Sequence, residues 1–319
     1  MNYIVFDLEW NQSPGGKKYS NSRLPFEIIE IGAVKMNEKR EPVDVFQRLI
    51  KPQVYNWIHD SIHEVIHVDY KDLADGLPFP EAVREFLDWC GDDFAFFTWG
   101  NQDVMELQRN MKYYDLLSLL PGPVKYYDVQ KVFSMCCKEA GGRRSLEFAI
   151  DQLDIPKEQT FHRALTDARY TAMVLKWVDE KILFTNYSMD VYQNPKKKKD
   201  ELFLSYPEHD QYVSREFTDR DKIMRDREVT STKCPICHLP AKRKIRWFMN
   251  NSKAYESISL CQKHGYVKGK IRIRHTEEDR YYVIKTLKNV SDEKAEEIRE
   301  KRDSLRKKRQ IKRKSEKQI

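Results

Sequence analysis

The sequence predicts a mixed α/β sheet flanked by helices, then a small cysteine-containing module and a charged C-terminal helix. Three strand-like segments come first, at residues 2–8, 27–36 and 43–50. Each is rich in β-branched or aromatic residues and bounded by chain-breaking residues. Strand-like and helical segments then alternate, an order typical of a sheet covered by helices.

The elements that follow show similar patterns. Residues 81–90 have helical periodicity with one apolar face, and residues 94–99 form a short apolar run typical of a buried strand. Further helices are expected at residues 101–111, 128–139, 146–153 and 162–181. Ser145 has the right position to cap the third of these helices.

A change in composition after Phe184 predicts the domain organisation. Residues 1–184 form the first domain, and residues 185–232, which have few apolar side chains, are expected to be a linker. Residues 233–290 form a compact module around three of the six cysteines. Residues 291–319 are expected to form a basic helical tail, whose apolar side chains are too sparse for a strong core face. This tail either adds non-specific affinity for the partner or is only a solvated face.

Charge is divided unevenly along the chain. The net charge of +7 combines −8 over residues 1–195 with +15 over residues 196–319. This asymmetry favours a polyanionic partner for the second part, and a merely solvated basic tail is the alternative. No apolar run approaches the roughly 20 residues that span a bilayer. Met1 is not followed by the pattern of a signal peptide, so a cytoplasmic location is expected.

Two carboxylates lie near the end of the first expected strand. Residues two apart in a strand point to the same face, so Asp7 and Glu9 project together, away from Phe6 and Leu8. Two adjacent carboxylates repel each other unless a cation neutralises them. Oxygen ligands alone suit Mg²⁺ or Mn²⁺. The alternative is a strand end with both carboxylates hydrated.

Two later segments offer similar chemistry. Asp103 follows the strand-ending Trp99-Gly100 pair, at the start of a helix, where an acidic residue also suits the helix dipole. His162 lies at the start of the last long helix and Asp167 one turn inside it. A histidine there titrates near neutral pH and can accept a proton from water. Either segment alone fits an ordinary helix start.

Together these segments resemble the three motifs of the DEDDh, or DnaQ-like, 3′→5′ exonucleases. The matching stretches are FDLEW with Asp7 and Glu9, TWGNQDVMEL with Asp103, and HRALTDA with His162 and Asp167. The form of the second motif is most similar to Eri-type RNA exonucleases and KapD-like bacterial exonucleases. The resemblance covers residues 1–184 and implies a ribonuclease H-like fold. Trp10 departs from it, because many relatives have threonine there.

The resemblance also implies a mechanism. Two Mg²⁺ or Mn²⁺ ions would be held by Asp7, Glu9, Asp103 and Asp167, and His162 would take the proton from the attacking water. The enzyme would hydrolyse the terminal phosphodiester of single-stranded nucleic acid, RNA favoured, and release nucleoside 5′-monophosphates. Leu8, through its backbone, and Trp10 are candidates for substrate binding, although Trp10 is equally suited to packing. A single-stranded DNA exonuclease and a non-catalytic nucleic-acid-binding regulatory protein are the alternatives.

The C-terminal module has a complete set of zinc ligands. Cys234 and Cys237 are followed after 23 residues by Cys261 and His264, a closed four-ligand set typical of one structural Zn²⁺. Two such pairs joined by strand-like sequence resemble a zinc ribbon. Basic and aromatic residues interleave around the ligands, at Lys242, Arg243, Lys244, Arg246, Trp247, Phe248, Tyr255, Lys268, Lys270, Arg272 and Arg274. This mixture favours contact with nucleic acid over a ribbon that only docks on protein.

Overall fold

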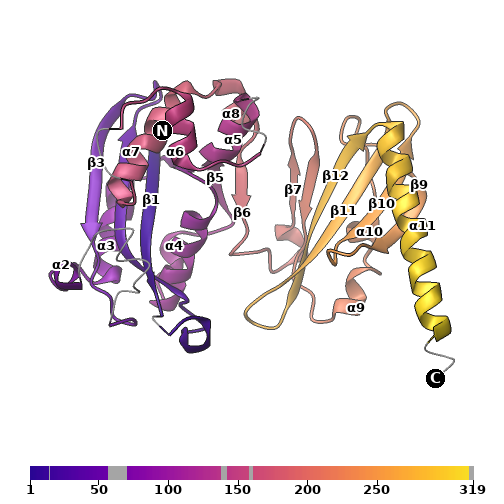
Figure 1. The fold of residues 1–319 in the computed structure, drawn as a ribbon, viewed down its shortest axis with the longest axis horizontal. Coiled ribbons are helices and arrows are strands. Elements are labelled where there is room, and N and C mark those ends of the chain that lie inside the picture. Colours follow the sequence, from indigo (N-terminus) through magenta and orange to yellow (C-terminus); the bar gives the residue numbers. More distant parts are fainter. Residues whose placement is uncertain (14, 57–69, 138–141, 158–160, 316–319) are drawn as a thin grey trace. The chain divides into compact units, whose positions relative to one another are not determined.

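The computed structural model describes residues 1–13, 15–56, 70–137, 142–157 and 161–315. The chain separates into two compact units, Met1–Gln193 and Asn194–Ile319 (Figure 1). Each unit contains its own six-stranded sheet. No helix in these described ranges is long and apolar enough to cross a membrane.

The first unit is a sheet with the strand order β3-β2-β1-β4-β5-β6. Strands β1 to β3 are antiparallel, β4 and β5 run parallel to β1, and β6 is antiparallel to β5. The strands are β1 (Asn2–Gln12), β2 (Phe26–Met36), β3 (Pro42–Leu49), β4 (Phe94–Thr98), β5 (Val124–Asp128) and β6 (Ser188–Asp190). The helices are η1 (Lys17–Tyr19), α2 (Tyr70–Ala74), α3 (Phe79–Cys90), α4 (Gln102–Tyr113), η2 (Leu117–Leu119), α5 (Val129–Cys136), α6 (Leu146–Gln152), α7 (Ala164–Trp177) and α8 (Glu180–Thr185).

Helices cover both faces of this sheet, which confirms the predicted mixed α/β fold (Figure 1). Ile4, Phe6 and Leu8 of β1 pack with α3 and α4 on one face. Tyr3 and Val5 pack with α5, α6, α7 and α8 on the other. Because side chains alternate along a strand, the residues that continue the second face toward the end of β1 are Asp7 and Glu9.

Three features of the first unit differ from the expectations. The five-residue strand β5 was missed, because its length and mixed pattern give too little periodicity to distinguish it. The helix expected over residues 162–181 is two helices, α7 and α8, separated at Val178. Strand β6 extends the first sheet into the stretch expected as a linker.

The second unit is an antiparallel sheet with the strand order β7-β8-β12-β11-β10-β9. Its strands are β7 (Leu202–Ser205), β8 (Asp210–Val213), β9 (Lys242–Met249), β10 (Tyr255–Cys261), β11 (Gly265–His275) and β12 (Tyr281–Val290). Its helices are η4 (Lys198–Asp200), α9 (Arg220–Ile223), α10 (Arg227–Thr230) and α11 (Asp292–Ser315). Helix α11 packs Ala295 and Ile298 against Ile245 and Ile258 of the sheet, so its first turns are not simply solvated.

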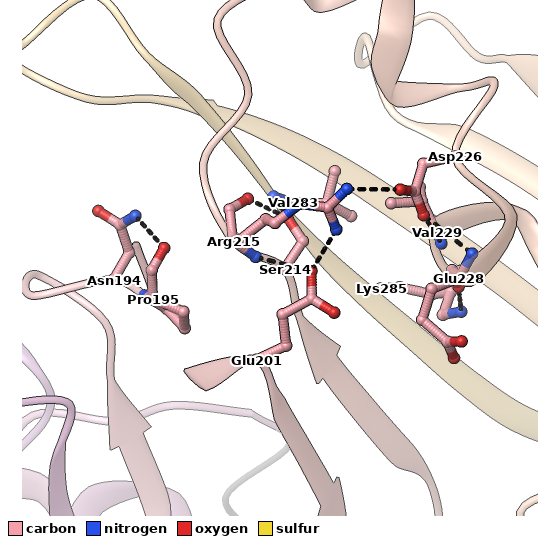
Figure 2. Close-up of polar contacts among 10 residues, drawn as sticks. All are labelled: Asn194, Pro195, Glu201, Ser214, Arg215, Asp226, Glu228, Val229, Val283 and Lys285. Atoms are coloured by element: carbon pink, nitrogen blue, oxygen red, sulfur yellow. Dashed lines mark hydrogen bonds and ion pairs between the residues drawn. The ribbon is translucent and has the colours of Figure 1, made fainter. Parts of the chain in front are cut away.

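The structure also differs from the expectation of a linker over residues 185–232. Arg215 donates to Glu201 at 2.7 Å and to Asp226 at 2.9 Å, joining three parts of that segment (Figure 2). The neighbouring Ser214 exchanges hydrogen bonds with the backbone of Val283 in β12. Polar networks and short strands hold this segment to the sheet. Neither feature leaves a periodic pattern of apolar residues in the sequence, so the segment resembled a linker.

Candidate active site and metal-binding groups

A cavity of about 380 Å³ lies where β1 and β4 end in the first unit. It gathers residues from five separate parts of the sequence. The lining residues are Asp7, Leu8, Glu9, Trp10, Trp99, Gly100, Asn101, Gln102, Asp103, Gln130, Arg143, His162 and Asp167. The structure therefore places all seven residues predicted for this site around one cavity.

Three carboxylates form the centre of the site. Asp7, Glu9 and Asp167 each offer one oxygen, and these oxygens lie within 4.8 Å of one another. Oδ1 of Asp167 is buried and has no hydrogen-bond partner among the described residues. A divalent cation would satisfy this orphaned oxygen and neutralise the three charges, so the residues present fit Mg²⁺ or Mn²⁺.

Gly32 allows the third carboxylate to reach the other two. Gly32 of β2 lies opposite Asp7 of β1, and the first turn of α7 crosses it. A Cβ at Gly32 would lie 2.0 Å from the backbone nitrogen of Leu165 and 2.2 Å from the carbonyl carbon of Ala164. Only glycine permits this approach, which brings Asp167 next to the β1 pair.

Asp103 lies beside this cluster rather than within it. It is the second residue of α4, a helix that three residues separate from the end of β4, and Gly100 makes the turn between the two elements with φ of 107°. Its Oδ1 accepts a hydrogen bond of 3.2 Å from the backbone N–H of Leu8. Asp103 is only 5% exposed, so its carboxylate is fixed against the end of β1.

His162 precedes α7 instead of lying within it. Its φ is 67°, an unusual conformation for a non-glycine residue. Its backbone N–H donates to Oδ2 of Asp167 at 3.3 Å, so the strained turn is tied to the carboxylate cluster. The side chain is exposed and lines the cavity, where a proton-accepting imidazole is accessible to water.

Burial and mutual repulsion raise the pKa of every acidic group at the site. Burial, followed by the charges of Asp103 and Glu9, raises the pKa of Asp7 well above its usual range. Burial, with the charge of Asp167, raises the pKa of Glu9 to about 8. Burial raises the pKa of Asp103 to about 7 and that of Asp167 to about 6. Without a cation the fully charged site is therefore unfavourable.

These shifts predict that the metal-free protein loses stability as the pH rises from about 4.5 to 8. Glu9 has an ordinary pKa of 4.5 and a folded value of about 8, so the folded state holds an extra proton in that window. Its contribution to the free energy of unfolding is complete below about pH 4.5 and is lost above about pH 8. Mn²⁺ replaces such protons, so its stabilising effect should grow with pH.

Thermal unfolding across this pH range, with and without Mn²⁺, measures both effects. Glu9→Gln is the control, because it removes the titrating group while keeping the side chain's shape. The wild-type Tm should fall more steeply with pH than that of the variant. If Tm depends on pH equally in the two proteins, and Mn²⁺ raises Tm equally at both ends of the range, Glu9 does not titrate at a metal-binding site.

The sequence did not single out Arg143, whose positively charged side chain lines this cavity. Arg143 is half exposed, and its Nη2 donates to Asp128 at 2.8 Å while its Nη1 donates to Gln130 at 3.1 Å. Asp128 is buried and also caps α5 through the backbone N–H of Lys131. This arrangement fixes a guanidinium at the cavity wall. A lone arginine in a loop carries no recognisable pattern, so only the fold reveals it.

The two expected substrate-binding residues have different surroundings. Leu8 is 3% exposed with its side chain in the core, so only its backbone borders the cavity. Trp10 packs against Phe26, with ring centroids 5.9 Å apart, and also lines the cavity. The structure thus shows the packing that the sequence suggested for Trp10 and places its side chain at the cavity, while contact with substrate stays a prediction.

The second unit brings Cys234, Cys237, Cys261 and His264 together, all within 4.8 Å through one ligand atom each. The Sγ atoms of Cys237 and Cys261 are 3.7 Å apart. A Zn–S distance of about 2.3 Å in a tetrahedron requires about 3.8 Å between sulfurs, so the residues fit zinc. The backbone N–H groups of Lys263 and His264 lower the pKa of the Cys261 thiol to about 6 and favour its thiolate form.

The aromatic residues expected to stack on bases are occupied elsewhere. Trp247 donates from Nε1 to the carbonyl of Thr230 at 2.9 Å, and its ring lies over Gly269. Tyr255 packs in the same core cluster, and Phe248 packs with the residues beneath α11. The structure therefore does not present these three rings as free faces for stacking on nucleic acid, because they are partly buried and pack against core side chains of the second unit.

Comparison with known proteins gives one family match. The sequence model of the RNase T exonuclease family matches residues 4–175. PolC-type DNA polymerase III of Clostridium perfringens is 28% identical over 213 residues, which is 64% of this chain and 12% of the polymerase. The PolC-type enzyme of Staphylococcus aureus strain RF122 is 26% identical over 172 residues, 54% of this chain and 11% of that protein. The chain thus spans about an eighth of the length of these relatives.

Solved structures with similar folds are more distant. The nuclease domain of 3'hExo, a DEDDh family member bound to rAMP, has a TM-score of 0.48 and 18% identity, covering 55% of this chain and 90% of that one. Cell-death related nuclease 4 has a TM-score of 0.46 and 17% identity, covering 61% and 71%.

Proposed function

This chain belongs to the exonuclease family, and from that premise we propose that it is a metal-dependent enzyme that shortens single-stranded nucleic acid from its 3′ end, with RNA favoured. The observation that carries the proposal is the cluster of Asp7, Glu9 and Asp167 oxygens within 4.8 Å, in a cavity shared with Asp103 and His162. At about 380 Å³ the cavity has the size of a small-molecule site and suits a terminal nucleotide.

The chain's own residues divide the work of hydrolysis. Asp7, Glu9 and Asp167 would hold divalent cations, with Asp103 beside them. When bound, these ions stabilise the attacking and leaving oxygens of an in-line displacement. His162 accepts a proton as water forms the new bond to phosphorus. The bond from phosphorus to the 3′-oxygen then breaks, and that oxygen takes up a proton and remains on the shortened strand.

Other residues of the cavity orient the substrate. Arg143, fixed by Asp128, has a planar guanidinium suited to a phosphate group. The backbone of Leu8 and the ring of Trp10 border the position of the terminal nucleoside. RNA is favoured over DNA because the Trp99-Gly100-x-x-Asp103 motif is similar to that of RNA exonucleases.

The test is digestion of 5′-labelled RNA and DNA of the same sequence, single-stranded and duplex, with Mg²⁺ or Mn²⁺. We expect a ladder that shortens from the 3′ end, fastest on single-stranded RNA. Internal cuts or release of the 5′ label as a mononucleotide would contradict the proposal. Faster shortening of single-stranded DNA than of RNA would favour the alternative, a single-stranded DNA exonuclease.

Substitution of His162 with alanine is expected to slow cleavage by about 10²–10⁴-fold, the usual contribution of general-base catalysis. Mn²⁺ should still stabilise the variant, because the three clustered carboxylates remain. Single-turnover rates and Mn²⁺-dependent Tm values measure the two effects. His209→Ala, in the second unit, is the matched control. Unchanged cleavage by His162→Ala would show that His162 is not the general base.

The second unit is proposed to be a zinc-stabilised module that holds substrate. Its ligand set is closed, which is typical of a structural zinc with no catalytic position. Asn289 supports the set, since its Nδ2 lies 3.9 Å from Sγ of Cys234 and donates to the carbonyl of His264 at 3.1 Å.

A further inference from the structure

We propose that a cavity beside the cysteine cluster of the second unit binds a backbone phosphate of single-stranded nucleic acid. The inference rests on the proposed function, because it names a second contact for the same substrate. The cavity has a volume of about 560 Å³. Its lining residues are Ser231, Thr232, Pro240, Ala241, Arg243, Lys244, Arg246 and Ser259.

Three exposed cations form one wall of this cavity. Arg243, Lys244 and Arg246 belong to β9, the strand at one edge of the second sheet. A shift in register between β9 and β10 leaves Lys244 as an additional residue between the pairs Ile245–Ile258 and Arg243–Ser259. None of the three cations forms an ion pair within the described ranges, and no lining residue is acidic.

The floor of the cavity supplies an independent observation. Ser259 of β10 is 1% exposed, and its Oγ has no hydrogen-bond partner among the described residues. A buried hydroxyl without a partner is costly, so one that borders a cavity indicates a missing ligand oxygen. Ser259 lies opposite Arg243 in the register, which places the hydroxyl and the guanidinium on the same face.

Charge on an edge strand has a simpler explanation, which is protection against pairing with another sheet. That explanation does not account for a cavity or for an unsatisfied hydroxyl at its floor. Two guanidinium groups, an ammonium and a hydroxyl are all donors, and together they match the acceptor oxygens of a phosphate. The volume leaves room for the adjoining sugar, so a phosphodiester of a strand fits better than a free anion.

The test measures binding of labelled single-stranded RNA to the full chain with zinc present. All proteins carry Asp7→Asn, so that cleavage does not interfere. The triple variant R243A/K244A/R246A is compared with R220A/K222A/R225A, which removes the same charge from exposed positions in and beside α9. Tm and zinc content establish that both variants are folded.

The cavity variant loses its contact with one phosphate, which should reduce the slope of log K against log salt by about 0.7, the value per phosphate for a single strand. The α9 variant should keep nearly the whole slope. Equal slopes in the two variants would overturn the proposal. A second result would overturn the proposal in favour of a site for a free anion. In that case inorganic phosphate would raise the Tm of the parent chain but not that of the cavity variant, and the two proteins would bind RNA equally well.

Ser259→Ala separates the site from general electrostatics. It should leave Tm unchanged or raised, because it deletes an unsatisfied buried hydroxyl. RNA affinity should fall about tenfold, because a hydrogen bond to a charged oxygen is lost. Unchanged RNA affinity would show that Ser259 does not contact the phosphate, and its unsatisfied hydroxyl would then no longer support the proposal. Failure of the exonuclease proposal is seen separately, as intact RNA after incubation with the chain that retains Asp7.

Discussion

Replacing Asp7 with asparagine is expected to reduce cleavage by about 10⁴-fold or more. The substitution keeps the side chain's shape but removes a carboxylate whose charge interacts with those of Glu9, Asp103 and Asp167. Loss of bound cations removes several kcal/mol of transition-state stabilisation, and each 1.36 kcal/mol is a factor of ten in rate. Without metal, the same change should raise Tm, since it relieves repulsion in a partly buried cluster of carboxylates.

Opposite effects on activity and stability distinguish this prediction from simple misfolding. Initial rates on single-stranded RNA and thermal unfolding in metal-free buffer measure the two quantities. Asp92→Asn, at an exposed carboxylate between α3 and β4, is the matched control and should change neither. A rate within tenfold of wild type, or a Tm lowered in the absence of metal, would be inconsistent with a metal-holding role.

Loss of zinc is expected to unfold the second unit while leaving the first folded. A structural zinc contributes about 10–16 kcal/mol in small modules, as much as the whole 5–15 kcal/mol stability of a typical domain. Cys234 and Cys261 are buried among Val267 and Leu287, so removal of the ion also disturbs the local core. Cys261→Ser should therefore abolish protection of β10 to β12.

Hydrogen exchange of the full chain, read separately for each unit, measures this effect alongside zinc content. Cys136→Ser is the control, because that thiol is partly exposed in the first unit and lies outside the cluster. The first unit should keep its protection and its cleavage of short strands. A Cys261→Ser protein that retains protected β10 to β12 would refute a structural zinc.

The sequence predicted the centre of the site because alternation in a strand is a local property. Asp7 and Glu9 share a face for the same reason that Tyr3 and Val5 do, and the fold only has to keep β1 straight up to that point. The zinc ligands were likewise visible, because the two members of each pair are three positions apart in the sequence, the usual spacing of zinc ligands. Short-range spacing carried both predictions.

Features that depend on long-range approach were not predictable. The role of Gly32 appears only when α7 crosses β2, and Arg143 acquires meaning only from its contact with Asp128. The segment expected as a linker becomes part of a sheet through β8 pairing with β12, more than 70 residues later in the chain. The residues Trp247 and Tyr255 have the composition of a binding surface, yet in the fold they are partly buried and pack against a core cluster.

The identity of the released nucleotide tests the central claim most directly. RNA labelled at its 3′-terminal nucleotide is digested in Mg²⁺ by the wild-type chain and by Asp7→Asn, and the product is separated from its isomers. Water directed by the carboxylate site must leave the phosphate on the 5′ side, so the account predicts a nucleoside 5′-monophosphate that disappears in the variant. A labelled nucleoside without phosphate, which attack by the neighbouring 2′-hydroxyl would release while leaving a 2′,3′-cyclic phosphate on the strand, would contradict it. So would a 5′-monophosphate that forms equally well without Asp7.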